Sequence, residues 1–127
     1  MRKNKYTSKE REASNRYSLI KTRMGGNINW DRKDFILWYV NTTKKCYYCE
    51  CTEKQLTKFH EITKSKRYKT RGNSLEIERL KDESYSKNNC VFACYWCNNA
   101  KSDVFSPKKF KSIGLEIGKV IRRSIKK

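Results

Sequence analysis

Residues 75–101 read LEIERLKDESYSKNNCVFACYWCNNAK, and their pattern predicts the central elements of the structure. Leu75–Leu80 alternates apolar and charged residues, which is the pattern of a half-buried strand. A polar loop follows, and the short apolar run Cys90–Ala93 predicts a second, buried strand. Cys94 then opens a segment that predicts a helix to about Asp103. The sequence therefore predicts strand, loop, strand and helix in direct succession.

The six cysteines divide into two knuckles and a remainder. Two residues separate Cys46 from Cys49 and Cys94 from Cys97, a spacing that lets both thiolates of a pair reach one tetrahedral ion. We expect these four cysteines to bind one structural Zn²⁺ per chain, which can contribute on the order of 10–16 kcal/mol to the folding of a small domain. The alternatives are buried free thiols or a redox pair. Two cysteines are predicted to pack beside the metal site without binding it: Cys51 and Cys90.

Cap residues predict helices on both sides of this stretch. Thr7 and Glu10, like Thr52 and Gln55, have the spacing of a capping box, which predicts a basic helix to about Arg23 and a short helix after the first knuckle. A further helix is predicted from Asp31 to about Asn41. The Ser106-Pro107 cap begins the last predicted helix. Its apolar stripe indicates core or a dimer seam, and Arg122 and other basic residues are expected outside that stripe. The stripe consists of Phe110, Ile113, Ile117, Val120, Ile121 and Ile125.

The composition indicates a strongly cationic protein. The 127 residues include 31 Lys and Arg against 13 Asp and Glu, for a net charge of +18, and 36% of them are apolar. No run approaches the ~20 apolar residues of a membrane-spanning helix. No apolar stretch follows the basic N-terminus, as it would in a signal peptide. We therefore expect an intracellular protein, in the cytoplasm of a microbial cell or of a phage-infected host, with a polyanion as partner.

Side chains with oxygen atoms occur near the end of the first predicted strand and at the start of the predicted helix. Glu78 is near the end of the first strand, and Asn98 and Asn99 are at the start of the helix that should lie across from it. A carboxylate and an amide oxygen are ligands suited to Mg²⁺ or a similar divalent ion. An ion bound to a phosphodiester can stabilise the charge that develops on the phosphate and on the leaving oxygen.

With these residues in place, the segment resembles the HNH, or ββα-metal, nuclease family. Glu78-Arg79 stands where that family has Asp-His, Asn89 at its middle Asn, Asn98-Asn99 at its final His-Asn, and Lys101 at a basic position that follows. The resemblance implies an α+β fold in which a small zinc-stapled ββα-metal motif is surrounded by helices. It also implies a metal-dependent endonuclease that hydrolyses phosphodiester bonds in double-stranded DNA, sequence-specific in a restriction-like or homing-like manner, and a homodimer.

The departures from the family pattern concern the general base. Arg79 replaces the usual His and cannot deprotonate near neutral pH. The chain resembles one restriction enzyme of the family in its acid–Arg pair Glu78-Arg79, its loop residues Tyr85-Ser86 and Asn98 after the last cysteine, and this likeness covers roughly residues 30–120. Tyr85 then becomes the candidate for activating water, against the alternative of a surface loop aromatic. His60 is a second candidate, against a packed or solvated helix residue, and Asn89 is expected to order the loop through backbone hydrogen bonds.

Basic and aromatic residues around the motif predict DNA contacts. We divide the chain into residues 1–44, a basic helical region that contacts DNA, and residues 45–127, the zinc-bound nuclease core, within one compact domain. A zinc-ribbon protein that binds nucleic acid through an inactive nuclease site is the main alternative, and an architectural protein is a third. The predicted DNA-binding residues are Arg16, Arg23, Lys44, Lys45, Lys64, Lys66, Arg67, Lys69, Arg71 and Lys101, with stacking by Tyr6, Tyr17, Trp30 and Tyr68.

Overall fold

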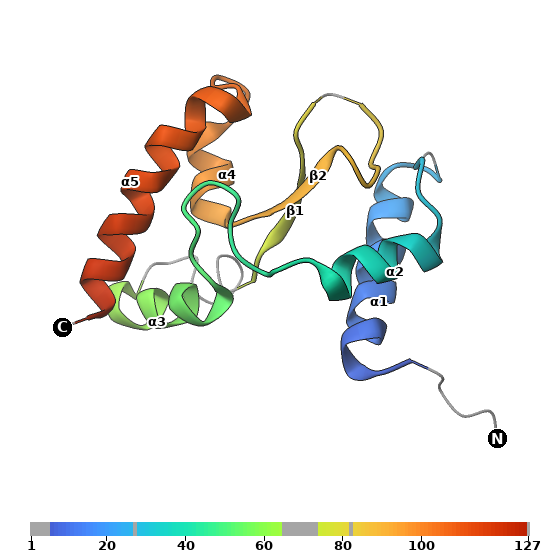
Figure 1. Cartoon of the computed structure of the whole chain (residues 1–127), viewed down its shortest axis with the longest axis horizontal. Coiled ribbons are helices and arrows are strands. Elements are labelled where there is room, and N and C mark those ends of the chain that lie inside the picture. The colour runs from blue at the N-terminus through green and yellow to red at the C-terminus, as the bar shows by residue number, and fades with distance from the viewer. Residues whose placement is uncertain (1–5, 27, 65–73, 82, 127) are drawn as a thin grey trace. The chain divides into compact units, whose positions relative to one another are not determined.

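The computed structural model describes residues 6–26, 28–64, 74–81 and 83–126 (Figure 1). Every predicted helix and strand is present in it, and α4 ends two residues before its predicted end. Among the described residues, no helix combines the length and apolar character that a membrane crossing needs. The elements, in chain order, are α1 (Ser8–Arg23), α2 (Arg32–Asn41), α3 (Glu53–Thr63), β1 (Glu76–Arg79), β2 (Cys90–Ala93), α4 (Tyr95–Lys101) and α5 (Pro107–Ile125).

The chain divides into two compact units. The helical unit comprises the chain to Thr43 together with Lys81–Cys90, and the knuckle unit comprises Lys44–Leu80 and Val91–Lys127. The loop between β1 and β2 groups with the N-terminal helices, which the sequence pattern did not predict.

Two helices and an aromatic cluster form the helical unit. The predicted capping box begins α1, where the Thr7 hydroxyl accepts from the Glu10 amide and the Glu10 carboxylate accepts from the Thr7 amide at 2.8 Å. α1 packs against α2, and the rings of Tyr17 and Trp30 lie 5.4 and 5.1 Å from that of Phe35. The rings thus form the core between the two helices.

The prediction that Tyr17 and Trp30 stack on bases is wrong. They are only 5% and 8% exposed, because the unit has few other apolar side chains with which to fill the space between α1 and α2. The Tyr17 hydroxyl donates to the Trp30 carbonyl at 2.6 Å, so its polar end is satisfied inside the protein.

In the knuckle unit, β1 and β2 pair into a two-stranded sheet and α4 follows β2 directly. Thr52 caps α3 in the predicted capping box with Gln55. α3 and α4 both pack against α5. A positive φ of 53° at Ser102 ends α4 and turns the chain toward α5.

Two glycines allow α5 to approach the first cysteine knuckle closely. A Cβ atom added at Gly118 would lie 2.2 Å from the carbonyl oxygen of Cys49, and one at Gly114 would lie 2.5 Å from the Cβ of Tyr48. Such distances are too short for any side chain. The backbone of α5 therefore packs directly on the knuckle, with no side chain between them.

This close approach changes the expected register of α5. Phe110 and Ile121 of the predicted stripe are buried, but Ile113 and Val120 are 37% and 52% exposed, because Gly114 and Gly118 occupy the contact. Arg122 was predicted to lie outside the packed face, and this is wrong. It is half-buried and donates to the Cys49 carbonyl at 3.0 Å.

Replacing Gly118 by Ala should therefore destabilise the protein. The added methyl group would displace the Cys49 backbone, and overpacking of this kind costs about 1–3 kcal/mol. Chemical denaturation should show this loss for Gly118→Ala but not for Ser112→Ala, which adds helix propensity at an exposed position of α5. Equal stability of Gly118→Ala and the wild type would contradict the packing described here.

Candidate functional site

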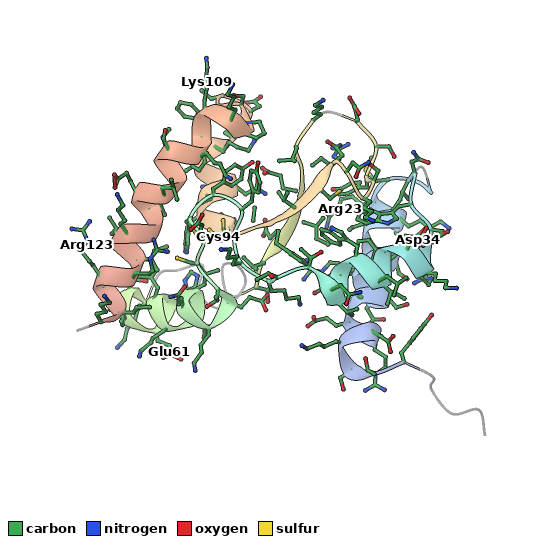
Figure 2. The ribbon with its side chains drawn as sticks, viewed as in Figure 1. Arg23, Asp34, Glu61, Cys94, Lys109 and Arg123 are labelled. Atoms are coloured by element: carbon green, nitrogen blue, oxygen red, sulfur yellow. The ribbon has the colours of Figure 1, made fainter. Side chains whose placement is uncertain are left out.

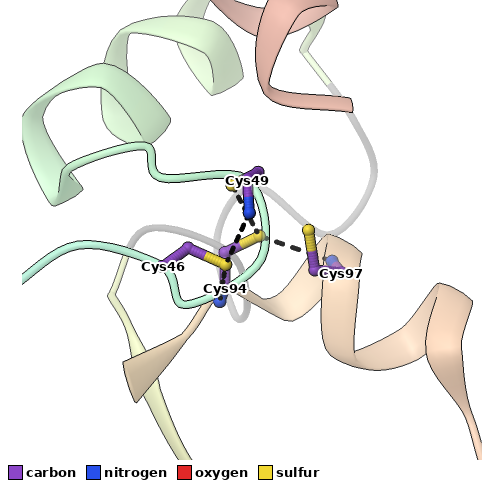
Figure 3. A group of neighbouring side chains, drawn as sticks. All are labelled: Cys46, Cys49, Cys94 and Cys97. Atoms are coloured by element: carbon purple, nitrogen blue, oxygen red, sulfur yellow. Dashed lines mark hydrogen bonds between the residues drawn. The ribbon is translucent and has the colours of Figure 1, made fainter. Parts of the chain in front are cut away.

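Four cysteines from two distant segments converge in the knuckle unit (Figure 3). The sulfur atoms of Cys46, Cys49, Cys94 and Cys97 all lie within 4.8 Å of one another, and all four residues are fully buried. The Cys49 and Cys94 sulfurs are 3.8 Å apart, close to the edge of a tetrahedron with metal–sulfur bonds of about 2.3 Å. The group can hold a metal ion such as zinc.

Backbone amides also point at these sulfur atoms. The amides of Tyr48 and Cys94 donate to the Cys46 sulfur at 3.4 and 3.3 Å, and the Cys97 amide donates to the Cys94 sulfur at 3.4 Å. Hydrogen bonds with Cys46 and the other neighbouring thiols lower the pKa of Cys49, whereas hydrogen bonds with Cys46, Cys49 and Cys94 raise the pKa of Cys97. All four can be thiolates together only when a cation neutralises them, which favours a metal site over a redox pair.

The two remaining cysteines lie outside this group, as predicted. Cys51 and Cys90 are buried, and Cys51 lies 3.7 Å from a guanidinium nitrogen of Arg122. That guanidinium also binds the Cys49 carbonyl, so a positive charge lies beside the thiolate cluster. A metal bound by four thiolates carries net negative charge, which this arginine offsets.

One face of β1 lies against α4 and carries two polar pairs. The Asn98 amide donates to Glu76 Oε1 at 3.4 Å, and the Lys101 ammonium lies 3.3 Å from Glu78 Oε1. Residues two apart on a strand share a face, and residues three apart on a helix do so as well, which explains the pairing. We expected Asn98 across from Glu78, and the structure places it across from Glu76.

Glu78 is 8% exposed, and both of its oxygens have partners. Oε2 accepts a short hydrogen bond from the Tyr48 hydroxyl, and Oε1 forms the ion pair with Lys101. Burial and the adjacent carboxylate raise the pKa of Tyr48, so the phenol keeps its proton and acts as the donor. The Lys101 ammonium also donates to the Ser102 carbonyl at 3.1 Å.

The loop between the strands is ordered by Asn89. Its Oδ1 accepts from the Lys81 amide at 2.9 Å, and its Nδ2 donates to the carbonyls of Lys81 and Ser84 at 3.1 and 3.2 Å. This is the loop-ordering role expected from the sequence. Tyr85, on the same loop, is 7% exposed, so the alternative of a surface aromatic is wrong.

Comparison with known proteins identifies the fold. No protein-family model matches the chain, and no curated protein matches it in sequence. Among solved structures, the rare-cutting HNH restriction endonuclease PacI is similar, with a TM-score of 0.67 and 26% sequence identity over 92% of this chain and 84% of the PacI chain. The chain has the HNH fold. This confirms the family resemblance, and the likeness is wider than the predicted residues 30–120.

His60 is in the knuckle unit and is shielded from solvent. It is fully buried on α3, its ring lies 5.1 Å from that of Trp96, and its Nε2 accepts from the Trp96 indole at 3.1 Å. With Nε2 as acceptor, the imidazole proton is on Nδ1. This placement agrees with the packed alternative, so we assign His60 to the packing of α3 on α4.

The predicted DNA-binding residues differ in accessibility. Arg23, at the end of α1 and labelled in Figure 2, is exposed, as are Lys45 and Lys64, while Arg16 and Lys44 are half-buried. Lys101 is buried against Glu78 and has no open approach for a phosphate. Some of the predicted residues lie outside the described part of the chain: Lys66, Arg67, Lys69 and Arg71, with the aromatic Tyr68.

Sequence reasoning missed two residues of the polar cluster at β1. Glu76 and Glu78 are two residues apart on β1. Because side chains alternate between the two faces of a strand, both carboxylates lie on one face. Tyr48 lies between Cys46 and Cys49 in the sequence. Its position is therefore fixed when these two cysteines come together with Cys94 and Cys97. No sequence signal joins Tyr48 to Glu78, because their contact spans 30 residues.

The four-cysteine site generates a direct prediction. Elemental analysis of purified protein should find about one zinc per chain, and Cys97→Ala should lose the metal and yield unfolded or insoluble protein, because three ligands forfeit most of the folding free energy. Cys90→Ala removes a buried thiol outside the group and should retain the zinc. Soluble, folded protein without zinc would contradict this assignment.

Proposed function

We propose that this protein is a metal-dependent endonuclease that hydrolyses phosphodiester bonds in double-stranded DNA at a specific sequence, as a homodimer. The observation that carries the proposal is the acidic face of β1 against α4, on a ββα unit joined by the cysteine group. Similarity to an HNH restriction endonuclease supports the same conclusion. The cysteine group is proposed to bind zinc.

The donor atoms on the β1 face fit a divalent ion such as Mg²⁺. Glu78 and Asn98 are the proposed ligands, and Glu76 adds a second carboxylate to the same face. Asn98 donates through Nδ2, so its amide oxygen is the atom suited to a metal. When bound, the ion supplies stabilisation of negative charge on the phosphate and the leaving oxygen.

Arg79 and Tyr85 are the residues proposed to bind phosphate and to activate water. Arg79 follows Glu78 on β1 and belongs to the opposite face, where its planar guanidinium can bind two phosphate oxygens at once. Tyr85 is proposed to activate the attacking water. Asn89 acts by holding the loop that carries Tyr85.

Charge supports binding to DNA. The net charge of +18 favours a polyanion, and each phosphate that a Lys or Arg neutralises steepens the salt dependence of binding. The proposed contacts are the predicted basic residues other than Lys101, which pairs with Glu78.

The half-exposed apolar side chains of Ile113 and Val120 on α5 support a dimer, which sedimentation equilibrium can test.

A second candidate function is nucleic-acid binding by an inactive site. The ion pair between Lys101 and Glu78 favours it, because an ammonium already neutralises the carboxylate that a divalent ion would need. Arg79 in place of the usual His points in the same direction. Cleavage of plasmid DNA with Mg²⁺, compared with EDTA, distinguishes the two functions.

Glu78→Gln should separate binding from cleavage. The amide lacks the negative charge that holds a divalent ion, so plasmid cleavage should fall about 100-fold or more, whereas DNA affinity and its steep decline with salt should persist. Glu61→Gln removes the same charge from the exposed face of α3 and should cleave normally. Glu78→Asp keeps the charge and matches the family residue, so it should retain measurable activity. Cleavage by Glu78→Gln at the wild-type rate would refute the metal assignment.

Tyr85→Phe tests the proposed base. The change removes one oxygen and keeps the buried ring, so single-turnover cleavage should fall about 100-fold or more with unchanged DNA binding. Tyr39→Phe is the matched control, since it removes another buried hydroxyl from the helical unit, one that donates to Glu12 at 2.9 Å. Arg79→Lys should also impair cleavage, because an ammonium cannot form the two-pronged phosphate contact. Full activity of Tyr85→Phe would exclude the phenol as base.

A further inference from the structure

The side chain of Tyr48 connects the cysteine group to the acidic face of β1. Tyr48 is fully buried, with an exposure of 0%, and its hydroxyl is the donor to Glu78 Oε2. A buried phenol and a buried carboxylate both cost free energy unless they are hydrogen-bonded, and here each satisfies the other.

Three neighbours fix the position of Tyr48. Its backbone amide donates to the Cys46 sulfur at 3.4 Å, so the metal-binding knuckle sets its backbone. Gly114 of α5 leaves no room beside its Cβ. The Phe110 ring meets its ring edge-on, at 5.3 Å between centroids and 89° between planes. These contacts hold the Tyr48 ring in the position from which its hydroxyl donates to Glu78.

The hydrogen bond determines which oxygen of Glu78 faces α4. With Oε2 held by Tyr48, Oε1 is turned toward α4, where the Lys101 ammonium lies at 3.3 Å. Without the hydroxyl, Lys101 would be the remaining described partner of the carboxylate. The side chain of Glu78 would then gain rotational freedom, because an ammonium is a point charge without directional preference.

We propose that Tyr48 is a positioning residue that presents Glu78 to a divalent cation and ties that site to the geometry of the four-cysteine centre. This inference rests on the proposed function, since it takes Glu78 as the cation ligand. Tyr48 touches neither the cation nor DNA. It acts through Glu78, and so its loss weakens cation binding more than it slows the reaction at saturating cation.

The test compares Tyr48→Phe with Tyr47→Phe, a change in the adjacent, half-buried tyrosine of the same knuckle. Binding of Mn²⁺, measured by electron paramagnetic resonance of the free ion, should weaken about tenfold or more in Tyr48→Phe and remain unchanged in Tyr47→Phe. The Mg²⁺ concentration for half-maximal DNA cleavage should rise by a similar factor, with kcat at saturating Mg²⁺ retained. Zinc content should stay at the wild-type value, whereas the melting temperature should fall because the buried Oε2 of Glu78 loses its donor.

A second measurement does not depend on how the Phe variant folds. The fluorine resonance of 3-fluorotyrosine at position 48 should shift when Mg²⁺ is added to otherwise wild-type protein, and should not shift in Glu78→Gln. Unchanged or tighter Mn²⁺ binding by Tyr48→Phe would overturn the inference, as would loss of zinc from that variant or a wild-type protein that binds no Mn²⁺. A wild-type protein that binds Mn²⁺ through Tyr48 and Glu78 but cleaves no DNA would instead refute the proposed endonuclease function.

Discussion

The four-cysteine centre is the constraint on which the knuckle unit depends. Two of its ligands precede α3 and two flank the start of α4, so one centre fixes segments that are 45 residues apart. The sheet has only two strands of four residues each, which cannot form a core by itself. The centre therefore substitutes for apolar burial in a chain with 36% apolar residues.

The same centre organises the neighbouring elements. Gly118 lets α5 rest on the Cys49 carbonyl, Arg122 binds that carbonyl from the next turn, and Tyr48 extends from the knuckle to Glu78. These contacts place a metal-binding loop, a helix and a candidate catalytic carboxylate in one connected group. Tyr48 thus connects the first cysteine knuckle to β1 through one hydrogen bond.

Short sequence patterns predicted the helices and strands. They did not predict the contacts between residues that are far apart in the sequence. The capping boxes at Thr7 and Thr52 and the Ser106-Pro107 cap each depend on residues within three positions, so the helix starts followed from the sequence. The pairs on the β1 face and the contact of Tyr48 with Glu78 depend on the rotation of α4 and on the path of the knuckle. The grouping of residues 81–90 with the N-terminal helices is likewise a tertiary property.

Lys101 explains how two carboxylates can share a largely buried strand face. An ionised carboxylate buried without a partner costs several kcal/mol, and the ammonium 3.3 Å from Glu78 offsets much of that cost. A divalent ion at the same oxygen and the ammonium are both cations, so the binding of one opposes the retention of the other. The ββα unit consequently carries its own counter-charge. The negative charge of Glu78 is thus paired within the described residues by Lys101.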